Sequence, residues 1–435
     1  MVEKKRFGSY REVLDFLFSS LPMYQRTGSA AYKIDLEVTH TMDAYFHHPH
    51  NKYPSIHIAG TNGKGSVSHM LASVLQEAGL KTGLYTSPHL KDFRERIKIN
   101  GDLIPKKYVI DFINDNFSFL SKIKPSFFEM TAAMAFQYFS EEQVDIAIIE
   151  TGLGGRLDST NIIHPVCSVI TNIGLDHTQF LGKSLTEIAH EKAGIIKNHI
   201  PVVVGKSQPE TEPVFRKAAT SCQSNILFAD QHFDIPYSMF APDGNQIFTV
   251  YKDHKPFLSN LETDLAGTYQ RENTATALQV IDTLKDQYRV DEHVLREGLK
   301  NVIRNTGLHG RWEVINQHPL TVCDTGHNAE AFRWILPQIK NTPYKKLHVI
   351  IGFVNDKHYR EMLEMLPKDA HYYFTQATIP RALPAEILQQ EAEKSGLSGI
   401  VVTPVSHAVE TARSQADKHD FIFIGGSTFV VAETI

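Results

Sequence analysis

The most informative part of the sequence is the loop Gly60-Thr61-Asn62-Gly63-Lys64-Gly65-Ser66. It follows a strand-like run, SIHIA at 55–59, and precedes a segment whose apolar residues recur at helical spacing. A glycine-rich turn from strand to helix directs backbone N–H groups and the positive end of the helix dipole at one point, where Lys64 adds a charge. This combination predicts a triphosphate site. The loop departs from the usual P-loop spacing, because two residues separate Gly60 from Gly63, and the alternative interpretation is a lysine-bearing surface turn.

Around this loop, short β-rich runs alternate with helix-like segments. The runs lie at 81–85, 144–149, 167–171 and 200–204. Such alternation predicts an α/β fold in which helices cover a mainly parallel sheet. Residues 225–265 are less regular, and their short strand-like pieces and turn residues predict a small antiparallel excursion.

A second α/β series follows a glycine-containing hinge. A helical stretch over 271–303 leads into RNTGLHGR at 304–311, which is typical of a domain boundary. Further strand-like runs lie at 320–324, 346–352, 371–376, 399–405 and 420–426. We therefore expect one domain over residues 1–303 and a separate, smaller α/β domain over residues 304–435.

Composition excludes several classes of protein. With 435 residues, 42% of them hydrophobic and 21% charged, the chain is typical of a globular protein of two or three domains. A net charge of -5 gives no general attraction to polyanions, so we expect no nucleic-acid partner. Three widely spaced cysteines form neither a disulfide framework nor a metal pattern, which indicates a reducing cytoplasm. We expect no membrane partner, because no apolar run approaches about 18 residues.

Three polar residues follow strands of the expected sheet. Ser87 lies just after the run at 81–85, Glu150 ends the run at 144–149, and His177 follows the run at 167–171. Because the carboxyl ends of parallel strands share one edge, these side chains are expected near the phosphate loop, where they could hold a divalent cation. Taken singly, each has a structural explanation, as a turn residue, a strand end or a hydrogen-bonded loop histidine.

Lys192 is expected to face inward. Ser184 and Glu187 have the spacing of a capping box, and Lys192 continues the apolar stripe of the helix that they begin. An inward lysine must be neutral, paired or modified. The alternative is that its stem lies on apolar surface while the ammonium group reaches water.

The second domain also carries polar groups near its first strand. Arg311 follows the hinge, and Asp324 and His327 end the run at 320–324. By donor and acceptor type, Arg311 suits a phosphate, Asp324 a ribose hydroxyl and His327 an adenine or phosphate edge. Asp356-Lys357 could face the same interdomain cleft. Structural salt bridges are the alternative for all of them.

Together these motifs resemble the Mur ligase superfamily, specifically its folylpolyglutamate synthase and dihydrofolate synthase branch. The resemblance rests on GTNGKGS, TSPHL, ETGLGGRLDSTN, NIGLDH, EKAGI, GRWE and DTGHN, between about His57 and Glu433. It implies an ATP-dependent amide ligase with a P-loop-type domain, a Rossmann-like C-terminal domain and a nucleotide site between them. The sequence departs from the family in DTGHNA, in DKH at 356–358, and in the segment 34–54, which contributes to pterin binding in relatives.

The resemblance also assigns roles to residues. It implies phosphate binding by Gly60 to Ser66, Mg²⁺ binding by Ser87, Glu150 and His177, and a carbamylated Lys192 at a second Mg²⁺. It places Asn273 near adenine, Arg311 on phosphate, and Asp324 and His327 at the nucleotide.

The expected reaction is addition of L-glutamate to dihydropteroate or to the glutamate tail of folates, through an acyl phosphate made from ATP. Lys64, Lys192, Arg311 and His327 are the expected catalytic residues, with His327 as a candidate base, and a monomer is expected. A ligase joining an amino acid to another carboxylate acceptor, and a nucleotide-binding regulatory module without ligase activity, are the alternatives.

Overall fold

The computed structural model describes residues 6–22, 35–241, 244–355 and 359–435. The chain forms two compact units: Met1–Asp264 with Arg271–Gly307, and Leu265–Gln270 with Leu308–Ile435. The boundary expected at 303/304 falls inside helix α13 (Val302–Thr306), one turn before the units divide.

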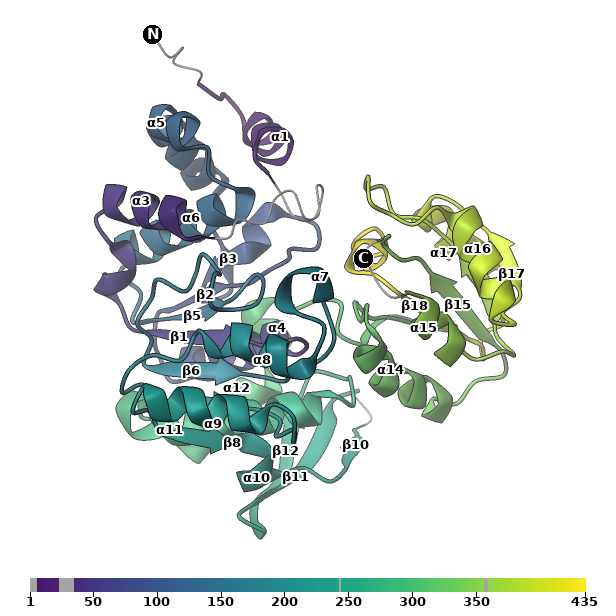
Figure 1. The fold of residues 1–435 in the computed structure, drawn as a ribbon. Coiled ribbons are helices and arrows are strands. Elements are labelled where there is room, and N and C mark those ends of the chain that lie inside the picture. Colours follow the sequence, from purple (N-terminus) through teal and green to yellow (C-terminus); the bar gives the residue numbers. More distant parts are fainter. Residues whose placement is uncertain (1–5, 23–34, 242–243, 356–358) are drawn as a thin grey trace. The chain divides into compact units, whose positions relative to one another are not determined.

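The first unit is built on an eight-stranded sheet in the order β4-β3-β2-β5-β1-β6-β7-β8 (Figure 1). Strands β2, β5, β1, β6, β7 and β8 pair in parallel, whereas β3 pairs antiparallel with β2 and the edge strand β4 pairs antiparallel with β3. The bounds are β1 (Ser55–Ala59), β2 (Thr82–Tyr85), β3 (Ile97–Ile99), β4 (Asp102–Leu103), β5 (Ile146–Glu150), β6 (Cys167–Ile170), β7 (Val202–Val204) and β8 (Ile226–Phe228). This confirms the predicted mainly parallel sheet.

Helices cover this sheet because its central strands are buried along their whole length. Helix α4 packs on β1, β2 and β5, while α1, α3, α5 and α6 share one core with the β2 and β5 side, and α8 and α9 share another with β6 to β8. The helices are α1 (Tyr10–Ser20), α3 (Glu37–Tyr45), η2 (Pro49–Lys52), α4 (Lys64–Glu77), η3 (Phe93–Arg96), α5 (Lys106–Ile123), α6 (Phe127–Glu141), α7 (Thr178–Leu181), α8 (Leu185–Ala193), α9 (Glu212–Ser221), α10 (Ala229–His232), α11 (Gln270–Tyr288), α12 (Glu292–Lys300) and α13.

The expected antiparallel excursion is a second, four-stranded sheet. It contains β9 (Phe233–Asp234), β10 (Ser238–Phe240), β11 (Gln246–Lys252) and β12 (Lys255–Thr263). All three pairings are antiparallel. The range 225–265 also contains β8, which belongs to the large sheet instead.

The second unit is a six-stranded sheet in the order β13-β14-β18-β15-β16-β17, parallel except for β13. Helices enclose two apolar cores on it, which confirms the expected second α/β domain. Its elements are β13 (Glu313–Gln317), β14 (Leu320–Cys323), α14 (Ala329–Asn341), β15 (Leu347–Ile351), α15 (Tyr359–Met365), β16 (His371–Phe374), α16 (Ala385–Lys394), β17 (Gly399–Val401), α17 (Val405–Gln415), β18 (Phe421–Gly425) and α18 (Thr428–Ala432). Within the part of the chain that the structure describes, no helix combines the length and apolarity needed to cross a membrane.

Candidate active site

Four neighbouring strands of the first unit bring the predicted groups to one edge. Strands β2, β5, β1 and β6 lie side by side and parallel (Figure 1). Ser87 follows β2, Glu150 ends β5 and the phosphate loop follows β1, while His177 lies in the segment after β6. The sheet order therefore places all four at the carboxyl edge, where ligands of open α/β sheets bind.

The phosphate loop needs glycine at two positions. Gly63 precedes α4 with a φ of 84°, and a Cβ atom there would lie 2.2 Å from Oδ1 of Asn273. A Cβ atom at Gly60, whose φ is 153°, would lie 1.8 Å from Oγ1 of Thr171. Both positions combine a backbone conformation that favours glycine with a close neighbour, so the loop geometry depends on their lacking a side chain.

The segment after β6 holds the loop in place. Thr61 N–H donates to the Asn172 carbonyl (3.0 Å) and Asn62 N–H to Oδ1 of Asn172 (2.9 Å). In return, the Thr171 hydroxyl donates to the Asn62 carbonyl (2.6 Å). The N–H groups of Thr61 and Asn62 are thus used inside the protein, where they hold the loop against the segment after β6.

Two lysines meet on one carbonyl at the start of this loop. Lys64 Nζ donates to the carbonyls of Gly60 (3.1 Å) and Thr61 (3.3 Å), and Lys192 Nζ donates to the same Gly60 carbonyl (2.8 Å). Lys192 is 3% exposed and faces inward, as its place on the apolar stripe of α8 predicts. Burial, and then the charge of Lys64, lower the pKa of Lys192 to about 7, while the carboxylates of Asp176 and Asp158 act in the opposite direction. The charge of Lys64 beside the loop therefore disfavours a second charge on Lys192.

Two of the predicted metal ligands are in direct contact. Glu150 is 3% exposed, and its Oε2 accepts a hydrogen bond from Ser87 N–H (3.3 Å). His177 lies next to Asp176, with Nε2 3.9 Å from Oδ1. Among the described residues, no three His, Cys, Asp or Glu side chains form a ready ligand set. Ser87 and Glu150 fit Mg²⁺, which prefers oxygen and keeps several of its waters.

Sequence reasoning missed a buried arginine at this edge. Arg96 is 2% exposed, its Nε donates to Nδ1 of His89 (2.7 Å), and its guanidinium lies over the Phe127 ring at 5.1 Å. Burial lowers the pKa of Arg96 to about 10, although the charge of Glu150 opposes that change. The available signal was a charged residue immediately before the short strand β3, close in sequence to the TSPHL segment.

The glycine-rich loop after Glu150 is organised by Asp158. Its Oδ2 accepts the Leu153 N–H (2.8 Å), and its Oδ1 accepts the Thr160 N–H (3.0 Å) and hydroxyl. Arg156 pairs instead with Glu191 of α8 (2.9 Å). Glu191 lies two residues before the end of that helix. These contacts tie the loop to the helix that carries Lys192.

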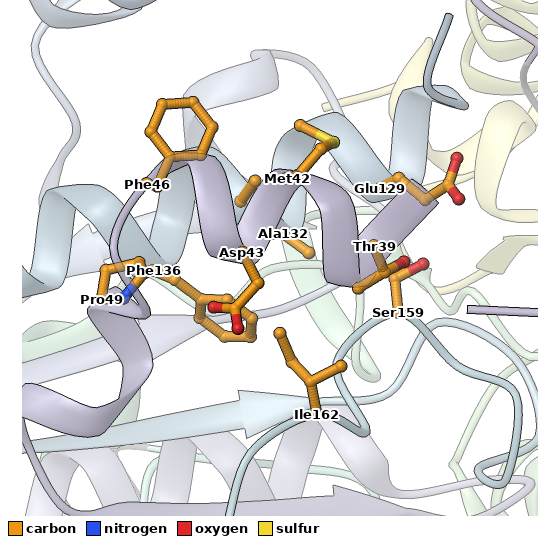
Figure 2. A pocket seen from close by; sticks show the side chains of 11 residues that line it. Thr39, Met42, Asp43, Phe46, Pro49, Glu129, Ala132, Phe136, Ser159 and Ile162 are labelled. Carbon is orange, nitrogen blue, oxygen red and sulfur yellow. The ribbon is translucent and has the colours of Figure 1, made fainter. Parts of the chain in front are cut away.

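A small pocket lies between α3 and α6 in the segment that departs from the family pattern (Figure 2). Asp43 of α3 lines it, and two imidazoles hold its carboxylate: Nδ1 of His48 (2.6 Å) and Nδ1 of His50 (2.8 Å). Burial lowers the pKa of His50. The pocket residues are Thr39, Met42, Asp43, Phe46, Pro49, Glu129, Ala132, Ala133, Phe136, Ser159 and Ile162. The histidine clamp fixes α3 as one wall of this pocket.

In the second unit the predicted nucleotide residues make internal contacts. Asp324 is 2% exposed and accepts hydrogen bonds from Tyr269 Oη (2.6 Å), Trp312 N–H (2.8 Å) and Gly326 N–H (2.7 Å). Burial raises its pKa, and these donors oppose the change.

Its neighbours are similarly engaged. Arg311 donates to the Gly310 carbonyl (3.2 Å) and to the Thr325 hydroxyl, and Nδ1 of His327 lies 3.1 Å from the Thr325 carbonyl. Asn273 belongs to the first unit, where it lies against Gly63 of the phosphate loop. Residues 356–358, which include the predicted Asp356-Lys357, lie outside the described residues.

Comparison with known proteins identifies the family of the chain. The Mur ligase middle domain matches residues 58–281, and the Mur ligase glutamate ligase domain matches residues 310–428. The folylpolyglutamate synthase of Lacticaseibacillus casei is 35% identical over 387 residues, covering 86% of this chain and 87% of that protein. A probable bifunctional folylpolyglutamate synthase/dihydropteroate synthase of Haloferax volcanii is 32% identical over 98% of this chain, which spans only 50% of that longer protein.

A solved structure shows the same architecture. The Escherichia coli protein FolC in complex with DHPP and ADP has a TM-score of 0.85 at 27% identity, covering 98% of this chain and 97% of its own. The fold, the loop between β1 and α4 and these likenesses agree, and the chain therefore belongs to the Mur ligase family, within its folylpolyglutamate synthase and dihydrofolate synthase group.

Proposed function

We propose that the chain is an ATP-dependent ligase that joins L-glutamate to a folate-type acceptor, either dihydropteroate or the glutamate tail of a folate. The observation that carries this proposal is the preformed loop from Gly60 to Ser66, on whose first carbonyl Lys64 and Lys192 meet. Positive charge fixed at a helix N-terminus suits the transfer of a phosphoryl group. The names of the relatives, and the DHPP and ADP held by the Escherichia coli neighbour, support the acceptor class.

The reaction has two steps. An oxygen of the acceptor carboxylate attacks the γ-phosphorus of ATP, ADP leaves, and an acyl phosphate forms. The amine of glutamate then attacks the acyl carbon, phosphate leaves, the amine nitrogen loses a proton and an amide remains. Lys64 and Arg311 are proposed to stabilise the charge on the transferred phosphoryl oxygens.

His327 remains the candidate base for the amine proton. Its Nδ1 lies 3.1 Å from a carbonyl oxygen, which can only accept a hydrogen bond. That contact favours the tautomer with the proton on Nδ1, so the basic lone pair lies on Nε2.

Ser87, Glu150 and His177 are proposed to hold Mg²⁺, which when bound would neutralise part of the triphosphate charge. We further propose that Lys192 is carbamylated and contributes an oxygen ligand to a second ion. Carbamylation requires a neutral amine, and a pKa of about 7 leaves a large part of Lys192 neutral at physiological pH. A monomer in the cytoplasm is proposed as the working state, with its domain boundary near residue 304.

Phosphate release by the purified full chain tests the function. The assay contains Mg-ATP and L-glutamate with dihydropteroate, tetrahydrofolate, a UDP-linked muropeptide or no acceptor, and mass spectrometry identifies the products. We expect acceptor-dependent release with at least one folate-type acceptor and a mass increase of one glutamyl unit. Release only with the muropeptide would instead support the ligase with another acceptor, and no acceptor-dependent release would favour the regulatory module.

A further inference from the structure

Helix α13 occupies the place where the chain leaves the first unit. The first unit ends twice along the sequence, after Asp264 and after Gly307. Gly307 directly follows α13 and has a φ of 61°, which makes it a left-handed helix end. Asp264 is far away in sequence, yet its Oδ2 accepts the Ile303 N–H of α13 at 2.8 Å. Both places where the chain leaves the first unit therefore adjoin one five-residue helix.

Opposite charges cap the two ends of this helix. Asp264 faces its N-terminal turn, while Lys98 of β3 donates from Nζ to the carbonyls of Thr306 (2.7 Å) and Gly307 (3.2 Å) at the C-terminal end. Lys98 is only 4% exposed. An anion at the N-terminus and a cation at the C-terminus are the arrangement that the helix dipole favours. Burial raises the pKa of Asp264 to about 6 and lowers that of Lys98 to about 8, so both groups are charged at pH 7.

A polar stripe on α4 joins the same helix to the phosphate loop. His69, Ser73 and Glu77 are spaced four residues apart, so they lie on one face of α4. Nδ1 of His69 lies 2.7 Å from the Thr306 hydroxyl, which itself donates to the Val302 carbonyl. Because that hydroxyl proton is already used, Nδ1 of His69 must be the donor.

The other two residues of the stripe, Ser73 and Glu77, form hydrogen bonds with α12 and α13. The Ser73 hydroxyl donates to the Gly298 carbonyl (2.6 Å). Nδ2 of Asn305 donates to Ser73 Oγ (3.1 Å) and to Oε1 of Glu77 (2.8 Å). All three residues of the polar stripe on α4 thus contact α12 or α13. Helix α4 itself begins at Lys64.

We propose that α13 is a charge-capped anchor, held by Lys98 and Asp264, that fixes the start of the hinge to the phosphate-loop helix and confines the bending of the chain to the segment after Thr306. Gly307 and Gly310 both have positive φ there, at 61° and 71°. Lys98 and Asp264 are accordingly positioning residues. The inference deepens the proposed function and rests on it for the turnover measurement, since lid and domain motions limit the turnover of many enzymes.

The test compares Lys98→Met, which keeps the aliphatic stem, with Lys107→Met as the matched control. The Lys107 side chain is 83% exposed and pairs with Asp111 on the surface of α5. Three quantities are measured on the full chain. The first is hydrogen exchange of the Asn305 and Gly307 amides, which donate to the carbonyls of Asn301 and Ile303. The others are kcat for acceptor-dependent phosphate release and Kd for the ATP analogue AMPPCP.

For Lys98→Met we expect amide exchange about tenfold faster and kcat about tenfold lower, with the Kd for AMPPCP within about twofold of wild type. Lys107→Met should match wild type in all three. Faster exchange with unchanged kcat, or a loss of AMPPCP affinity as large as the loss of kcat, would overturn the proposal. If Lys98→Met does not fold, Asp264→Asn, which keeps the size of the side chain, is judged by the same criteria.

The two proposals can fail separately. If wild type releases no phosphate with any folate acceptor, the proposed function fails and the anchor is judged by exchange alone. In that case, unchanged exchange of the Asn305 and Gly307 amides in Lys98→Met overturns the anchor, and faster exchange supports it.

Discussion

The two units use their polar strand-end residues in different ways. In the first unit, Lys64 and Lys192 share a single backbone carbonyl, an arrangement in which the charge of Lys64 disfavours a charge on the buried Lys192. In the second unit, Asp324 accepts three hydrogen bonds from its own surroundings and is 2% exposed. The comparison teaches that similar sequence positions, just after a parallel strand, can serve either chemistry or the stability of a loop, and that the partners of the side chain distinguish the two.

The largest effect is expected at Lys64. Lys64→Ala should reduce turnover about a thousandfold, because a charge that stabilises the transferred phosphoryl group is lost, while circular dichroism and the melting temperature stay near wild type. Lys107→Ala, at an exposed position on α5, is the control. Normal turnover in Lys64→Ala would remove the assignment of chemistry to this loop.

The next effect concerns the shape of the loop. Gly63→Ala should lower the free energy of unfolding by about 3 kcal/mol, because the new Cβ meets Asn273 and the backbone has positive φ. Gly79→Ala is a matched control, since its φ is 81° and nothing lies within 4 Å of a Cβ there. In urea melts, we expect that control to lower the free energy of unfolding by about 1 kcal/mol. Equal losses in the two variants would show that the contact with Asn273 does not shape the loop.

In the second unit, Asp324→Ala should act mainly on stability. Removing the carboxylate leaves Tyr269 Oη and Trp312 N–H without their acceptor, which should cost about 2 kcal/mol. Asp369→Ala, at an exposed position, serves as the control. If the variant kept wild-type stability but lost much of its ATP affinity, Asp324 would act in nucleotide binding rather than in the stability of its loop.

The remaining effect is a pH dependence of the stability at Lys192. Its pKa is about 7 in the folded chain against 10.5 for an ordinary lysine, so between these values the unfolded chain binds more protons and the stability of wild type rises with pH. Relative to Lys192→Met, the melting temperature of wild type should therefore improve from pH 7 to pH 9.5. The scans use CO₂-free buffer without nucleotide or Mg²⁺. A constant difference between the two proteins would contradict an inward lysine with a lowered pKa.

Features encoded by local sequence could be predicted. The turn from β1 to α4, the alternating strands and helices and the inward face of Lys192 follow from turn chemistry and helical spacing, and the structure has all three. The departure of segment 34–54 from the family pattern was also visible, but the clamp of His48 and His50 on Asp43 was not.

Contacts between distant residues could not be predicted. The close packing of Asn273 against Gly63, the burial of Arg96 and the three donors to Asp324 depend on how remote segments pack. Residue type gives donors and acceptors, but only the fold shows whether they are already used. Asp324 illustrates this, because its chemistry suits a ribose hydroxyl while its contacts stabilise its own loop.

Isotope transfer from the acceptor to phosphate tests the central claim most directly. The acceptor carboxylate is labelled with ¹⁸O, the full chain is supplied with Mg-ATP and L-glutamate, and the released phosphate is analysed by mass spectrometry. In an acyl phosphate, one carboxylate oxygen leaves with phosphorus. Each amide formed should therefore release one phosphate that carries one ¹⁸O atom. Unlabelled phosphate, with the label retained by the acceptor or found in AMP, would contradict the account.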